Sequence, residues 1–295
     1  MRFLEKVSGW LLAVGLAIAA LFAFNYLDIF VILCFRWAGV NTAIYRGCVS
    51  LTAALVNTLA FGLFFFLCKK FKRPLLQVKK ISLVDIGLVI IIALGMLGFV
   101  KTFIYVSDQI SEYIKSLSEQ MTEYRESVDR YSTVKQDIVP FWDSLIYLFS
   151  LCFIVPIEEE LVFRGAIFGL LRQKMSPSAA ILTSAVIFGV MHRVSIHTAY
   201  ALVCGLILCA CYHYTKSLIA SVIIHSIFNI LGSGIGDLLK LQELGVPSDI
   251  RLAVLSRISV ICIMMLIPSG IAFLILRYNS RKQEKVKTES VAAVE

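Results

Sequence analysis

Three stretches of apolar residues without a single charged side chain constrain this chain most. They cover residues 9–27, 47–68 and 258–276. Each approaches the ~20 residues that an α-helix needs to cross the hydrocarbon core of a bilayer. Hydrophobic residues make up 59% of the sequence and charged residues only 16%, which excludes an ordinary soluble enzyme and a disordered chain. The sequence therefore predicts an integral membrane protein.

Five shorter apolar runs extend this pattern. Each of them becomes a membrane helix if it continues past its flanking polar residues. These runs cover residues 86–100, 144–157, 179–191, 199–214 and 218–235. We therefore expect an all-α fold, a polytopic membrane helix bundle of about eight transmembrane helices.

The basic residues indicate how the spans are oriented. Segment 69–80 holds six Lys and Arg residues and no acidic residue, which is typical of a cytoplasmic loop. With eight spans, both termini then lie in the cytoplasm. The net charge of +8 is spread over the ends of the apolar runs and does not form one stripe. We interpret it as a topology signal and expect no nucleic-acid partner.

One long connection, residues 107–140, carries a pattern of its own. Apolar residues recur in it at alternating steps of four and three, which is a heptad stripe on an otherwise charged helix. The stripe consists of Ile110, Ile114, Leu117, Met121, Tyr124, Val128 and Tyr131. The pattern predicts an extramembrane amphipathic helical loop on the extracytoplasmic side. It is compatible with self-association through 110–131 and equally with packing on the outer surface of the bundle.

Four ionisable residues stand at the end of one apolar run: Glu158, Glu159, Glu160 and Arg164. Ionisable groups inside a bilayer are costly, and they are functional candidates by default. Glu160 and Arg164 are four residues apart, so we expect an ion pair on one helix face, which leaves Glu159 to face elsewhere. If Pro156 ended the span, the three acids would instead be a solvated helix end.

Two further polar pairs stand on later apolar runs. Phe188 and His192 are four residues apart, as are His225 and Asn229, so each pair shares a helix face. If neighbouring spans form antiparallel hairpins, both pairs reach the membrane depth of Glu159. A carboxylate beside a neutral imidazole, with His and Asn donors opposite, provides a general base and an oxyanion site. This combination favours peptide hydrolysis by an activated water.

These segments resemble the motifs of a known family. Residues 159–165 match EExxxR, residues 188–192 match FxxxH, and residues 225–229 match HxxxN of the CPBP intramembrane proteases. This family includes CAAX-prenyl endopeptidases and bacterial bacteriocin-processing or self-immunity (Abi) proteins. The resemblance covers about residues 141–235. Glu158 departs from the motif as a third acid, and the spacing to the arginine selects the two later glutamates as the motif's pair.

The resemblance implies a role for each motif residue. Glu159 would activate the attacking water, and His192 would assist it. The oxyanion site would consist of His225 and Asn229. The supporting residues would be Glu160, Arg164 and Phe188.

The function that the resemblance implies is hydrolysis of peptide bonds in a bacterial plasma membrane. The partners would be the lipid bilayer and a membrane-associated or secreted peptide or protein, in bacteriocin or peptide-pheromone processing or in self-immunity. We expect no cofactor. The alternative within the family is a zinc-dependent protease with His192, His225 and Glu159 as ligands, a set that tetrahedral zinc sites accept.

Two interpretations without protease activity stay open. A membrane immunity factor or sensor scaffold could use the polar residues only to hold helices together, although interhelical hydrogen bonds in membranes contribute only about 0.6 to 2 kcal/mol each. A transporter could use the three glutamates as a proton-coupled site, but the chain shows no inverted repeat.

The sequence divides into five segments. Residues 1–106 would hold the N-terminal transmembrane helices, 107–140 the heptad-patterned loop, and 141–235 the catalytic core. Residues 236–278 would form a loop and the last transmembrane helix. We expect residues 279–295 to be a polar, disordered cytoplasmic tail.

Overall fold

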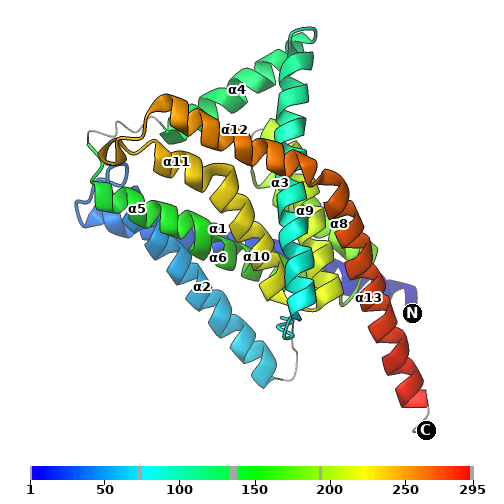
Figure 1. The fold of residues 1–295 in the computed structure, drawn as a ribbon. Helices are drawn as coiled ribbons and strands as arrows, with labels where there is room; N and C mark the ends of the chain where they lie inside the picture. Colours follow the sequence, from blue (N-terminus) through cyan, green and yellow to red (C-terminus); the bar gives the residue numbers. More distant parts are fainter. Residues whose placement is uncertain (1, 72–74, 133–137, 193–194, 293–295) are drawn as a thin grey trace.

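The computed structural model describes residues 2–71, 75–132, 138–192 and 195–292, and this part of the chain folds as a helical bundle (Figure 1). Extended backbone pairs there in one isolated antiparallel bridge, between Val78 and Ser217. The protein is therefore an all-α, polytopic helical membrane protein, as the sequence predicts.

Five helices of the described part are long and apolar enough to cross a membrane. They are α1 (Arg2–Trp37), α2 (Arg46–Lys70), α3 (Leu83–Ser111), α9 (Ser195–Thr215), and α10 (Leu218–Asn229) with its continuation through η3 (Ile230–Gly234) and α11 (Ile235–Leu239). A sixth candidate is a bent pair, α12 (Ser248–Met264) and α13 (Leu266–Ala292). Five or six candidate spans thus have the length and apolar character that a membrane helix needs, whereas the sequence predicts about eight.

The two other predicted spans take different forms. The run at residues 144–157 lies in a composite helix that consists of α5 (Phe141–Phe149), η1 (Ser150–Ile154), α6 (Val155–Glu160), η2 (Leu161–Ile167) and α7 (Phe168–Leu171). The five charged residues of this helix lower its hydropathy: Asp143, Glu158, Glu159, Glu160 and Arg164. The run at 179–191 becomes α8 (Pro177–Val190), whose 14 residues reach only ~21 Å.

The C-terminal region refines one prediction and corrects another. The apolar run at 258–276, which the sequence predicts as a span, bends by 48° between α12 and α13, because Pro268 cannot continue a helix from the preceding turn but fits the first turn of a new one. The predicted disorder of the tail is wrong up to Ala292, where α13 ends. Lys216 forms an ion pair with Glu284 of this helix, 3.2 Å apart, which joins the tail to the bundle.

Side-chain caps fix where several helices begin. Ser82 and Ser176 each accept a hydrogen bond from the first turn of the helix that follows. The start of α2 is capped from another helix, because the Asp143 carboxylate accepts hydrogen bonds from the backbone N–H groups of Gly47 and Cys48. This cap joins α2 to the composite helix, which carries the glutamates.

Helix α3 is the central support of the bundle and packs against α9, α10, α12 and α13 (Figure 1). Its buried face is apolar between residues 89 and 100. Gly95 and Gly98 allow close approach, since a Cβ at these positions would collide with Ser269 and with the Cys262 carbonyl. The core therefore lies between α3, α9, α10 and the composite helix.

From Leu117 on, the heptad pattern of the long loop lies in α4 (Lys115–Ser132), which forms a hairpin with the end of α3 (Figure 1). The first two positions of the stripe depart from the prediction, because Ile110 belongs to α3 and Ile114 to the turn, and both are exposed. Met121 is 2% exposed, and the Tyr124 ring lies 6.4 Å from that of Tyr200 in α9. The stripe therefore packs on its own bundle over these residues. The side chains of Val128 and Tyr131 lie outside the described part, and self-association stays a prediction.

Candidate functional site

The composite helix departs twice from α-helical geometry, and the glutamates lie between these departures. The segments η1 and η2 are π-helical, and α6 with the three glutamates separates them. Widened turns of this kind are rare and often mark functional sites. Here they present carbonyl groups to other helices. Leu151 O accepts a hydrogen bond from Asn229 Nδ2 at 2.9 Å, and Phe163 O accepts one from Ser184 Oγ at 3.2 Å.

Glu160 is a fully buried carboxylate with a partner on each oxygen. Oε2 lies 3.0 Å from Arg164 Nε, which is the ion pair that the sequence predicts. Oε1 lies 3.0 Å from His225 Nδ1. The Arg164 guanidinium also lies over the Phe188 ring, 4.6 Å from its centre. Glu160 is therefore engaged in holding Arg164 and His225.

Glu159 is in a different environment although it is the preceding residue. Its side chain is 23% exposed, and its Oε2 lies 3.8 Å from His225 Nε2. This distance is too long for a direct hydrogen bond, so another polar atom can contact both groups. The His225 ring thus lies between the two acids: Nδ1 faces Glu160 and Nε2 faces Glu159.

The Phe188 ring joins the two histidines of the motifs. Its centre lies 4.8 Å from that of His192 and 6.3 Å from that of His225. His192 follows the end of α8, and its Nδ1 lies 2.8 Å from Phe188 O. Among the described residues, no hydrogen bond joins His192 to Glu159. The Phe188 ring therefore lies between His192 and the rest of the site and contacts the rings of both His192 and His225.

Asn229 connects α10 to the composite helix through its hydrogen bond to Leu151 O. An amide nitrogen carries two protons, so this bond occupies only one of its donors. The structure thus brings Glu159, Glu160 and His225 into direct proximity and holds Asn229 by the backbone of η1.

Two polar residues near the site are absent from the motifs and were missed in the sequence. Asn57 Nδ2 donates a hydrogen bond to Asp28 Oδ1 at 2.8 Å. The Asp28 carboxyl interacts electrostatically with Glu159, and Glu158 interacts with both Asp28 and Asn57. Asp28 ends the first charge-free window, and Asn57 lies inside the second one. The sequence signal for these two residues was therefore their position inside or directly after a predicted span.

The zinc alternative concerns the same side chains. Within the part of the chain that the structure describes, no three His, Cys, Asp or Glu side chains gather as a metal-binding group. His225 Nδ1 is held by Glu160, so only Nε2 could bind a metal. The predicted ligand set of His192, His225 and Glu159 therefore does not assemble here, and we derive no step through a metal.

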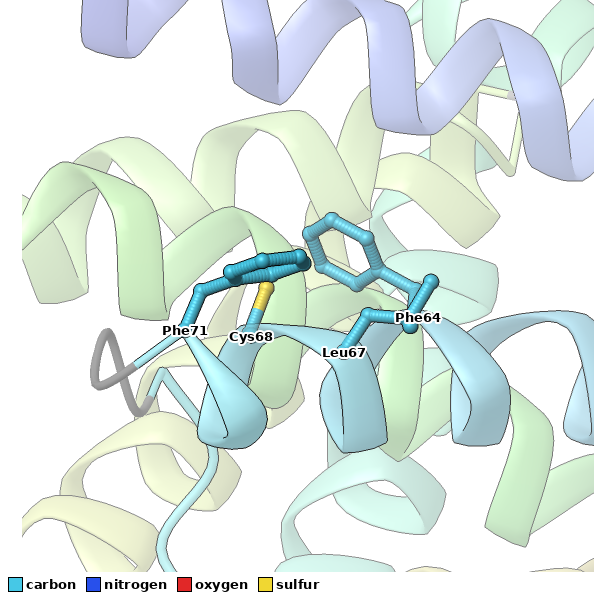
Figure 2. A pocket seen from close by; sticks show the side chains of 4 residues that line it. All are labelled: Phe64, Leu67, Cys68 and Phe71. Carbon is cyan, nitrogen blue, oxygen red and sulfur yellow. The ribbon is translucent and has the colours of Figure 1, made fainter.

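A cavity of about 490 Å³ lies at the end of α2 and contains none of these groups (Figure 2). Phe64, Leu67, Cys68 and Phe71 line it, and Figure 2 shows the Cys68 sulfur beside the two aromatic rings. This lining offers no carboxylate or imidazole. The motif residues beside the composite helix therefore lie outside this cavity.

Comparison with known proteins agrees with the motifs. Residues 141–231 match the family described as type II CAAX prenyl endopeptidase Rce1-like. The matched segment contains the composite helix and α8 to α10, and so every motif residue, but neither Asp28 nor Asn57. The chain matches no curated protein and no solved structure.

Proposed function

We propose that the protein is an intramembrane endopeptidase that uses a water activated by Glu159, because residues 141–231 match the Rce1-like type II CAAX prenyl endopeptidase family, which implies peptidase activity. The observation that carries this proposal is the contrast between neighbouring acids. Glu160 has a partner on both oxygens, whereas Glu159 is partly exposed and faces His225 across 3.8 Å.

The proposed reaction needs no covalent intermediate. A water between Glu159 and His225 gives a proton to the carboxylate as its oxygen attacks the peptide carbonyl carbon. The resulting oxyanion is stabilised by the second N–H of Asn229 and by His225 when Nε2 carries a proton. Glu159 then returns its proton to the leaving nitrogen as the C–N bond breaks. His192, whose ring contacts that of Phe188, assists Glu159 in activating the water.

The proposed substrates are membrane-associated or secreted peptides or proteins. The motif residues lie on helices of a polytopic membrane protein, which supports substrates in or at the bilayer. We place the protein in a bacterial plasma membrane with both termini in the cytoplasm, as the basic segment 69–80 favours. Bacteriocin or peptide-pheromone processing and self-immunity are the proposed roles.

The proposed mechanism uses no cofactor, and a chelator distinguishes it from the zinc alternative. Turnover by the purified protein should persist in EDTA and in 1,10-phenanthroline, with no stoichiometric metal in elemental analysis. Loss of turnover that zinc restores would replace this mechanism with the one in which His192, His225 and Glu159 bind the metal.

The central experiment compares peptides in membranes that contain the wild type or Glu159→Gln. Mass spectrometry should find new peptide termini with the wild type that are missing with the variant. Glu243→Gln is the matched control, because this exposed glutamate lies outside the family domain. Identical peptides for wild type and Glu159→Gln would contradict the proposed function and favour a non-catalytic scaffold.

A further inference from the structure

Three polar side chains outside the motifs' assigned roles meet beside Glu159. They come from three helices: Asp28 from α1, Asn57 from α2 and Glu158 from α6. The Asn57 amide donates to Asp28 at 2.8 Å and also interacts with the Glu158 carboxyl. Asn57 is fully buried and Glu158 is 6% exposed, whereas Asp28 is half-buried. The cluster therefore has a closed end and a more open end.

This cluster lacks a positive charge of its own. Among the described residues, neither Asp28 nor Glu158 forms an ion pair, in contrast to Glu160 with Arg164. Buried acidic groups are normally paired, because an uncompensated charge is costly in a medium of low dielectric constant.

Two oxygen atoms of the cluster also lack hydrogen-bond donors. Glu158 Oε2 and Asn57 Oδ1 are buried, and neither has a hydrogen-bond partner within the described part of the chain. The Asn57 nitrogen donates to Asp28, so its amide is directed into the cluster. Buried acceptors are nearly always satisfied in proteins. A ligand that complements these oxygens therefore brings both hydrogen-bond donors and a positive charge.

We propose that Asp28, Asn57 and Glu158 bind a protonated amine of the substrate. An ammonium group is compact, carries three donors and has no acceptor, so it complements a set of carboxylate and amide oxygens. The amine belongs either to a lysine side chain or to the N-terminus of the peptide. Half-buried Asp28 provides its entry.

This site names the substrate class of the proposed peptidase, and in that sense it rests on the proposed function. Glu158 is directly followed by Glu159, whose carboxyl interacts with those of both Glu158 and Asp28. An amine held here lies next to the carboxylate that activates water. The preferred peptide therefore carries its positive charge close to the scissile bond.

A binding experiment tests the site without any hydrolysis. The probes are n-hexylammonium and n-hexanol, which share chain length and differ in charge. The full-length protein in detergent should bind hexylammonium, and Asp28→Asn and Glu158→Gln should each weaken that binding about tenfold or more, as for a desolvated charge pair. Hexanol binding should not change. Asp249→Asn, at an exposed position in the first turn of α12, is the control and should match the wild type.

Peptide turnover then identifies the source of the amine. Four versions of a cleaved peptide carry either lysine or norleucine beside the scissile bond, with a free or an acetylated N-terminus. The wild type should prefer one charged version about tenfold in kcat/KM. Asp28→Asn should lose this preference. If replacement of lysine by norleucine lowers kcat/KM, the amine is that of the lysine side chain; if acetylation lowers it, the amine is the N-terminus.

Two results would overturn the cation site. One is equal binding of hexylammonium by the wild type, Asp28→Asn and Glu158→Gln, which would mean that the carboxyls hold only a shared proton. The other is equal turnover of all four peptides by the wild type. If Glu158→Gln does not fold, Asp28→Asn still tests the site by itself, because Asp28 is only half-buried. The binding result also stands apart from catalysis, because it remains valid if Glu159→Gln keeps its turnover.

Discussion

Helix α3 and the composite helix at 141–171 both contribute residues to the core of the bundle, but of these two only α3 is regular. Between residues 89 and 100, α3 buries only apolar residues and glycines. The composite helix contains two π-helical segments and places three glutamates between them. Its widened turns redirect side chains and present carbonyls to Asn229 and Ser184. The regular helix supports the bundle, whereas the irregular one positions reactive groups.

The strongest test of this difference is Glu159→Gln in the composite helix. This change keeps the shape of the side chain and removes the base. Turnover of a cleaved peptide should fall by about 10²- to 10⁴-fold, the usual contribution of a general base. The melting temperature in detergent should stay near that of the wild type, because Glu159 is partly exposed and has no close ion pair. Near wild-type turnover by Glu159→Gln would mean that another group acts as the general base.

Glu160→Gln should have the opposite profile. Arg164 is 1% exposed and would lose its counter-charge, and removing one member of a buried pair costs about 3–5 kcal/mol. The variant should melt at a lower temperature and be less abundant in membranes. The measurement is thermal denaturation of both glutamate variants in the same detergent. A stable but inactive Glu160→Gln beside an unfolded Glu159→Gln would exchange the roles of the two acids.

The sequence predicted the fold class and the Glu160–Arg164 pair because both depend on local patterns. Apolar windows indicate spans, and a spacing of four residues indicates a shared helix face. It also directed attention to Phe188 and His225, whose rings contact in the structure. Spacing alone was sufficient here because all of these residues lie on helices.

Other features depend on tertiary packing and have no local signal. The π-helical segments arise where carbonyls such as Leu151 O find side-chain donors from distant helices, which a regular period of 3.6 residues does not reveal. The bend before α13 interrupts an unbroken apolar window. Asp28 and Asn57 lie far from the motifs in the chain, so their proximity to Glu158 appears only when α1 and α2 pack on the composite helix.

The role of α3 as a support can be tested with two glycines. Gly98→Ala should destabilise the protein by about 1–3 kcal/mol through overpacking, because its Cβ would collide with the Cys262 carbonyl of α12. Gly87→Ala is the matched control, since its Cβ would have open space, and it should stabilise the helix by about 0.5–1 kcal/mol. Thermal denaturation measures both. Equal effects would mean that α3 and α12 are not closely packed.

The smallest effect is expected for Ser184→Ala, which removes a hydrogen bond to the π-helical segment η2. Phe163 O also accepts the backbone N–H of Phe168, so it keeps one partner. The loss should therefore be about 0.5–1.5 kcal/mol, with little change in turnover. Ser256→Ala is the control, because Ser256 is exposed and its hydroxyl donates to a carbonyl of its own helix. A loss of turnover specific to Ser184→Ala would show that this bond between helices sets the widened turn, and with it the position of the glutamates.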